Sequence, residues 1–301
     1  MMMDRDKIIL PQQPISASPE QVALTRQHLL PAQDVIYDYL LGLRAELDPV
    51  LSQRFPTRFG KPYPLGCCLE ISNRVVGELN KRIHNPTHAG LAAIRAFVAA
   101  GGKVRSIWGV LRESYFQNAM QFGDLYVDVS NDTVTPTKPK VEILPMAQSG
   151  LVAIRDIDHF IRTADNYWQM KIYANHALPG LAPFMPMIGI YKTGEPCLQS
   201  ASDYMIALML LDRFQMAEHW LRNGPPAPAS VVDAFRDAAA AHLRPLPGQD
   251  DREAAILACQ FLRAMPRDDL WRQRDDRVRD YLRLMDELAR RGIVSAPPSG
   301  E

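Results

Sequence analysis

The chain has 301 residues with 34 basic and 34 acidic side chains, so its formal net charge is zero, and apolar types make up 47% of it. This composition is typical of globular proteins, which excludes a largely disordered chain and argues against the strongly basic surface of a nucleic-acid-binding domain. No apolar run approaches the roughly 20 residues needed to span a membrane, and the first residues lack the pattern of a signal peptide. The four cysteines are too few for a disulfide framework and form no C-x-x-C pair. We therefore expect a reduced, cytoplasmic protein that binds neither nucleic acid nor a membrane.

The first third of the chain is predicted to be a flexible arm followed by helices. Residues 1–18 are polar and contain prolines, and Ser18-Pro19 has the pattern of a helix start, with Ser as the cap and Pro at the first helical position. Apolar residues then recur at helical spacing. The predicted helices cover about 20–30, 32–53, 67–83 and 89–100.

After Gly101-Gly102 the pattern changes from that of helices to that of strands. Three runs rich in Val, Ile, Tyr and Phe predict strands, and Gly123-Asp124 between the last two suits a tight hairpin. A further edge strand is expected at Val141–Leu144. Because helices and strands are segregated along the chain, the fold class is α+β, with helices around a small antiparallel sheet.

The second half of the chain is predicted to be mostly helical. Helical patterning covers about 154–176, an apolar loop rich in Pro and Gly follows at 178–198, and a strongly apolar helix covers 200–221. The sequence NGPPAPAS, at 223–230, has the composition of a linker, and three amphipathic helices come after it. We therefore divide the chain into an arm (1–18), an α+β core domain (19–222) and a C-terminal helical region (223–301).

One cysteine lies where a nucleophile would be activated. Gly66-Cys67-Cys68 opens a predicted helix, and the positive end of a helix dipole lowers the pKa of a thiol there. A helix and two strands follow, and the second strand ends in Asp128. In a Cys–His–Asp site, one strand supplies the base and the next supplies the acid that orients it.

The order and spacing of these motifs resemble the transglutaminase-like branch of the papain-like cysteine enzymes, over about residues 60–135. That family opens its core helix with Gly-x-Cys and continues with a helix that ends in Gly, a His-bearing strand, a Gly turn, an aromatic residue and an Asp. The matching residues here are Gly66, Cys68, Glu70, Ile71, Ser72, Gly101, Gly123, Tyr126 and Asp128. The resemblance implies a papain-like core and acyl transfer or amide hydrolysis through a Cys68 thioester, with Asp128 as the orienting acid.

The position of the catalytic histidine, eleven residues before Asp128, holds Gln117. Glutamine has no titratable nitrogen and cannot act as a general base, although it can polarise a substrate group. No histidine lies between His88 and His159, so a base would have to come from outside the motif. The candidates are His159 and His176.

Two hypotheses of different classes follow. The protein is an enzyme acting on an unidentified small molecule or protein through Cys68, or it is a catalytically inactive relative that serves as a binding module. In the second case Cys68 is a small buried residue and Asp128 caps a turn. Another chemistry, with the apolar loop 178–198 as a pocket wall, is a third alternative. We expect no cofactor and no metal, because Asp156 and His159 share a helix face but are too few ligands for a metal site.

Overall fold

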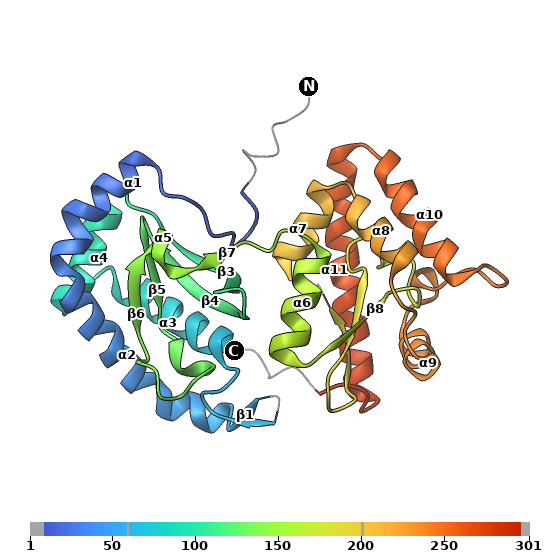
Figure 1. Cartoon of the computed structure of the whole chain (residues 1–301), viewed down its shortest axis with the longest axis horizontal. Coiled ribbons are helices and arrows are strands. Elements are labelled where there is room, and N and C mark those ends of the chain that lie inside the picture. Colours follow the sequence, from blue (N-terminus) through green and yellow to red (C-terminus); the bar gives the residue numbers. More distant parts are fainter. Residues whose placement is uncertain (1–8, 59, 200–201, 296–301) are drawn as a thin grey trace. The chain divides into compact units, whose positions relative to one another are not determined.

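The computed structural model describes residues 9–58, 60–199 and 202–295, and the chain divides into two compact units (Figure 1). The N-terminal unit is Gln12–Ile154. The C-terminal unit combines Met1–Pro11 with Arg155–Glu301. The boundary therefore falls at residue 154, whereas the sequence pattern predicted one after residue 222. No helix in the described part of the chain has both the length and the apolar character required to cross a membrane.

Helices form most of the first hundred residues of the N-terminal unit. Ser18 caps the first helix by accepting a hydrogen bond from the Gln21 N–H, and His88 caps α4 in the same way from Gly90. A π-helical turn and a 3-10 turn follow the first helix, at Thr25–Leu29 and Leu30–Ala32. The α-helices of this unit are α1 (Pro19–Leu24), α2 (Gln33–Arg54), α3 (Cys68–Arg82), α4 (Ala89–Ala99) and α5 (Met146–Ser149).

A five-stranded antiparallel sheet of order β6-β5-β4-β3-β7 forms the rest of this unit. Its strands are β3 (Val104–Leu111), β4 (Tyr115–Phe122), β5 (Leu125–Asp128), β6 (Glu142–Pro145) and β7 (Leu151–Val152). A separate two-stranded hairpin joins β1 (Thr57–Arg58) to β2 (Lys61–Pro62). The main core lies between one face of the sheet and the helices, and it includes Leu40, Ile71, Phe97, Met120 and Val127. The predicted mixture of helices and antiparallel strands is thus confirmed.

The C-terminal unit has a three-stranded antiparallel sheet of order β10-β9-β8 and a set of helices. The strands are β8 (Lys171–Ala174), β9 (Met187–Ile190) and β10 (Pro196–Gln199). The α-helices are α6 (Ile157–Trp168), α7 (Asp203–Leu211), α8 (Gln215–Asn223), α9 (Ala229–Ala238), α10 (Asp251–Ala264) and α11 (Arg267–Arg290).

Several elements of this unit differ from the prediction. The helix expected over 154–176 ends at Trp168, because Gln169 takes a left-handed conformation with φ 51° and β8 follows. The apolar loop contains β9 and β10. The helix expected over 200–221 is two helices, separated where Arg213 and Phe214 both have positive φ.

The expected linker at 223–230 is integrated into the C-terminal unit. The Ala174 N–H at the end of β8 donates to the Pro225 carbonyl at 2.8 Å, and Ala174 forms an isolated bridge with Pro226. Proline lacks an N–H but keeps its carbonyl, so a proline-rich segment can still pair in this way. The C-terminal helices therefore share a unit with residues 155–222 and do not form a separate region.

A flexible arm was predicted over residues 1–18. Its residues 1–8 lie outside the described residues, and the described part packs against the rest of the protein. In the C-terminal unit, Leu10 is buried and borders a small groove with Leu211 and Leu270. From Gln12 onward the chain belongs to the N-terminal unit. The arm thus connects the two units.

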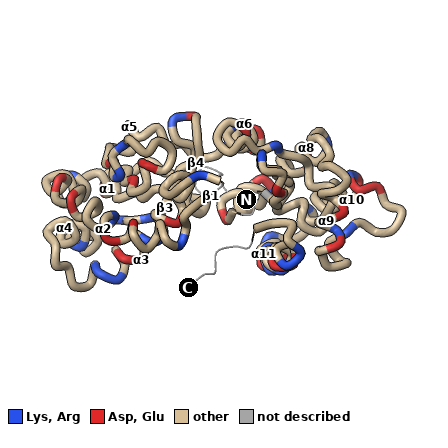
Figure 2. Tube along the Cα trace, turned by 90° about the horizontal axis from the view of Figure 1, so that it is seen from below, with Lys and Arg blue, Asp and Glu red and all other residues tan. Residues whose placement is uncertain are grey.

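Charge is distributed in pairs of opposite sign along α11. Figure 2 shows acidic and basic residues intermixed on this helix. Many of them form ion pairs three residues apart, such as Arg272 with Asp269 at 2.9 Å and Arg290 with Glu287 at 2.7 Å. Exposed pairs of this kind contribute little to stability, and they give α11 a mixed-charge, solvated face.

Candidate functional site

Cys68 is the first residue of α3, at the end of a tight turn. Gly66 has a φ of 76°, a left-handed conformation that favours glycine, and its N–H donates to the Thr133 carbonyl at 3.0 Å. The Cys68 side chain is buried, with 8% of the residue exposed. The helix N-terminus favours a thiolate, but burial raises the pKa of the Cys68 thiol, and this effect outweighs the hydrogen bonds from Asn118 that lower it.

The residue that meets Cys68 is Asn118 on β4. Its Nδ2–H donates to Cys68 Sγ at 3.4 Å. Successive side chains of a strand point to opposite faces, so the neighbouring Gln117 is directed away from the face that Asn118 occupies. The structure therefore brings Cys68 to the predicted strand, but pairs it with the residue after Gln117.

Gln117 and Asp128 lie together on adjacent strands. Gln117 Nε2 donates to Asp128 Oδ2 at 2.8 Å, and both side chains are buried. The Tyr126 hydroxyl donates to the same oxygen at 2.9 Å, while the Ser130 N–H and hydroxyl donate to Oδ1 at 2.7 and 3.0 Å. These four donors occupy the carboxylate, and none of them is a cation.

Burial dominates the electrostatics of Asp128. It raises the pKa of this carboxyl to about 6, although hydrogen bonds from Ser130, Tyr126 and Gln117 act in the opposite direction. The bond from the Ser130 N–H, two residues along the chain, is the turn-capping contact that the second hypothesis gives to Asp128.

Ser72 links α3 to this network. Its hydroxyl donates to the Asn118 carbonyl at 3.1 Å and lies 3.4 Å from the Ser130 hydroxyl. No role was predicted for Ser130 from the sequence. Its only signal was its place two residues after an aspartate, where an Asp side chain often accepts from the main chain.

The histidines of the N-terminal unit have other partners. His88 Nδ1 accepts from the Gly90 N–H at 3.1 Å, and its ring lies 5.2 Å from that of Tyr39. In the part of the chain that the structure describes, neither His28, His84 nor His88 forms a hydrogen bond with the Cys68 or Asp128 side chain. In this unit the Cys68 thiol and the Asp128 carboxylate are instead hydrogen-bonded by amide and hydroxyl groups.

The two candidate bases, His159 and His176, both belong to the C-terminal unit, where they stabilise local structure. His159 is buried near the start of α6, and its Nδ1 accepts from the Arg155 N–H at 3.3 Å. His176 Nε2 lies 2.8 Å from the Leu221 carbonyl, so this nitrogen carries the proton. Burial lowers the pKa of His176, against the effect of that hydrogen bond, and favours the neutral ring.

The apolar loop 178–198 is largely core structure, apart from an exposed turn at 192–194. Phe184, Met185 and Met187 are buried, and the Phe184 ring packs edge-on against Phe214 at 5.0 Å. Asn175 fixes the start of the loop, because its side chain donates to the Met185 carbonyl at 3.0 Å and accepts from the Leu178 N–H at 3.2 Å. These residues fill the unit and do not present an apolar wall to a ligand.

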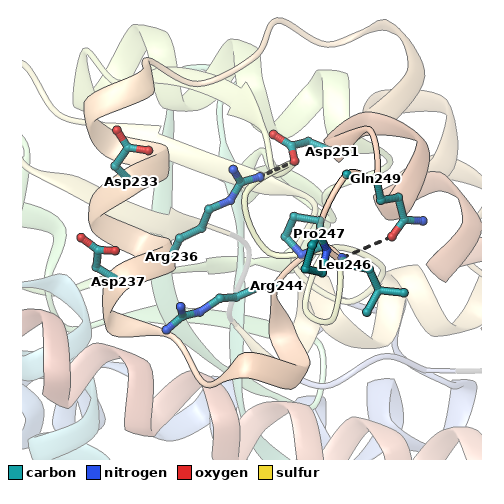
Figure 3. Close-up of a pocket in the computed structure, with 10 residues that line it drawn as sticks. Asp233, Arg236, Asp237, Arg244, Leu246, Pro247, Gln249 and Asp251 are labelled. Carbon is teal, nitrogen blue, oxygen red and sulfur yellow. Dashed lines mark hydrogen bonds and ion pairs between the residues drawn. The ribbon is translucent and has the colours of Figure 1, made fainter.

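A cavity of about 400 Å³ opens beside α9 in the C-terminal unit (Figure 3). Its arginines are engaged within the protein. Arg236 pairs with Asp251 at 2.5 Å and donates to the Ala177 carbonyl, and Arg244 donates to the Ala239 carbonyl. No sequence pattern pointed to this cavity, and its mixed charges select no ligand class. No group of three or more His, Cys, Asp or Glu in the described residues is arranged to hold a metal ion.

Comparisons with protein-family models, with curated proteins and with solved structures gave no match for this chain. The function is therefore inferred from the geometry of the site.

Proposed function

We propose that the N-terminal unit is a catalytically inactive, transglutaminase-like module that acts by binding. One observation carries the proposal: amide side chains contact the thiol and the carboxylate, where a Cys–His–Asp enzyme has a single imidazole that contacts both. Asn118 donates to Cys68 Sγ, and Gln117 donates to the Asp128 carboxylate. A carboxamide cannot take the proton of a thiol or return it to a leaving group.

The state of the thiol supports the same conclusion. The thiolate is the nucleophile, and its population at neutral pH depends on the thiol pKa. Burial raises the pKa of Cys68, as it raises those of Cys67, Cys197 and Cys259 to about 12. A full positive charge beside Sγ would reverse this effect, and the groups that hydrogen-bond Cys68 are uncharged.

Asp128 has a structural role in this proposal. In an active triad the carboxylate orients an imidazole and stabilises its positive form. Here its hydrogen bonds come from Gln117, Tyr126 and Ser130, which connect β4, β5 and the following turn. The cluster fixes the shape of the sheet, and it offers no proton-transfer path to Cys68.

The alkylation rate of Cys68 tests the proposal. Iodoacetamide labelling of each cysteine is followed by mass spectrometry from about pH 6 to about pH 9, with buried Cys259 as an internal reference and Cys68→Ser as the site control. We expect Cys68 to react slowly, with a midpoint above the free-thiol value of about 8.5. Fast alkylation of Cys68 that persists below neutral pH would instead support acyl transfer through a thioester and contradict the binding-module proposal.

A further inference from the structure

The N-terminal arm is held on the sheet of the N-terminal unit through its main chain. The Trp108 N–H on β3 donates to the Gln12 carbonyl at 2.7 Å. The Gln121 side chain on β4 donates to the Ile15 carbonyl at 2.8 Å and accepts from the Ile15 N–H at 3.4 Å. In Figure 1 the dark-blue segment before α1 runs past β3 and β7.

Gln121 is pre-organised for this contact. Its side chain is buried, and Nε2 also donates to the Gly123 carbonyl at 3.0 Å, which fixes the orientation of the amide. A carboxamide presents one donor edge and one acceptor, as a peptide group does. It therefore binds the N–H and carbonyl of a single residue of a passing chain, whatever that residue's side chain.

The sheet is also shaped to admit a second chain beside β3. A Cβ at Gly109 would collide with the Val152 carbonyl oxygen and lie 3.4 Å from Pro14 Cγ, so glycine allows both segments to approach. β7 pairs with β3 only at Val110 and Leu111. The contact from Trp108 to Gln12 continues main-chain pairing along β3 beyond that point, as in recognition by strand addition.

We infer that Trp108, Gly109 and Gln121 form a recognition site for an extended peptide of a partner protein, and that Gln12–Ile15 occupies it as an intramolecular ligand. The inference rests on the proposed binding function. The ligand is an extended segment with a free N–H and carbonyl at one residue. A proline fits just before that residue, where Pro14 lies.

A peptide of a partner can compete with the arm for this site. The hydrogen bonds of the arm to the sheet include the three named above, and residues 12–15 are only half-buried, so their main chain is within reach of a competitor. The net stabilisation from one such bond is similar to the entropy cost of ordering one residue. The arm remains in place because its attachment to the chain gives it a high effective concentration.

Peptide binding in trans tests the inference. A fluorescent peptide of residues 11–18 is titrated by anisotropy against the full chain and against its Ile15→Pro variant, which lacks the N–H that Gln121 accepts. We expect the variant to bind the peptide about fivefold tighter than the natural chain, because its own arm competes less well. The peptide carrying the same Ile15→Pro change is expected to bind the variant chain about fivefold more weakly than the unchanged peptide.

Gln121→Met in the Ile15→Pro chain supplies a second measurement and is expected to abolish peptide binding, with circular dichroism to check folding. Equal binding by the natural and Ile15→Pro chains, or binding by neither, would overturn the inference. So would a concentration-dependent dimer of the natural chain that Ile15→Pro abolishes, because the occupant would then be the arm of a second copy. Cys68 alkylation on the same samples separates the two proposals: slow alkylation without peptide binding rejects only the peptide site.

Discussion

Two buried aspartates of the N-terminal unit lie four residues apart in the sequence and have opposite surroundings. Asp128 is bound by uncharged donors alone, from Gln117, Tyr126 and Ser130. Asp132 is bound by the Arg44 guanidinium through two parallel hydrogen bonds, at 3.1 and 3.2 Å. Both carboxyls are almost fully buried. Their difference therefore isolates the effect of a cation on a buried acid.

Arg44 keeps its charge in the interior of the protein by forming ion pairs with carboxylates. Arg44 is inaccessible to solvent, and it also donates to Asp48 at 3.0 Å and to the Val129 carbonyl. Burial alone would raise the pKa of Asp48, but hydrogen bonds from Lys140 and Tyr63 and the charge of Arg44 hold it below its ordinary value. Nearby cations thus lower the pKa of Asp48, whereas burial without a cation raises the pKa of Asp128 to about 6.

Removing the cation should have the largest effect. Arg44→Met leaves Asp132 buried without a positive partner, and breaking a buried pair in this way costs about 3–5 kcal/mol. We expect that loss in the free energy of unfolding, measured with urea near neutral pH. Arg82→Ala, which removes a half-exposed arginine paired with Glu46 and Glu78, is the control and should cost less than about 1 kcal/mol. Equal losses in the two variants would contradict the assigned role of Arg44.

The pH dependence of stability should separate Asp128 from Asp48, a second partner of Arg44. The folded-state pKa of Asp128 is about 6, above its ordinary value of 3.8, so the native state holds this proton more tightly than the unfolded state. The stabilisation of the folded state by this proton is complete at low pH. It is lost as the pH rises through about 4 to 6, which lowers the free energy of unfolding by about 3 kcal/mol. Asp128→Asn should flatten this part of the unfolding free-energy curve relative to the natural chain.

The pKa shift of Asp48, in the same unit, has the opposite sign to that of Asp128. Because its pKa is lowered, its contribution is present above 3.8 and is lost as the pH falls further. Asp48→Asn should therefore change the unfolding free energy below about pH 4. It should leave the interval between about pH 4 and 6 unaltered. If Asp128→Asn and Asp48→Asn shift the curve in the same interval and direction, the contrast between the two environments is incorrect.

Replacing an amide side chain beside Cys68 or Asp128 with a histidine should give a smaller effect. Asn118→His puts an imidazole where an amide now lies 3.4 Å from Cys68 Sγ. We expect alkylation of Cys68 near neutral pH to become about tenfold faster, because a neighbouring imidazolium stabilises the thiolate. Gln117→His makes the same change at a residue bonded to Asp128 and should have less effect. A larger acceleration from Gln117→His would show that this position, and not Asn118, faces the thiol.

Much of the N-terminal unit was predictable from the sequence. α2, α3 and α4 have regular apolar spacing and clear boundary residues, and the hairpin at Gly123 has a strong turn signal. Cys68 was expected at the start of a helix and is found there. The pairing of Cys68 with Asn118 was not predictable, because a shift of one residue along a strand reverses the face of every side chain.

Other features lacked a local signal. Arg44 continues the apolar face of α2 that contains Leu40 and Leu47, and its acceptors Val129 and Asp132 come from far along the chain. The strands β8 to β10 are only four residues each, and short apolar runs do not distinguish strand from helix or buried loop. The attachment of the arm depends on the Gln121 side chain, which sequence patterns do not connect to Ile15.

The division of the chain also sets an order of assembly during synthesis. The C-terminal unit includes residues before Gln12 and after Ile154, so the whole N-terminal unit is inserted within its sequence. A ribosome delivers the chain from its N-terminus, and domains fold as units as they emerge. Leu10 is synthesised before any of the inserted unit, yet its groove partners on α7 and α11 appear only after that unit is complete. The inserted unit is thus free to fold first, while the leading segment waits for its partners.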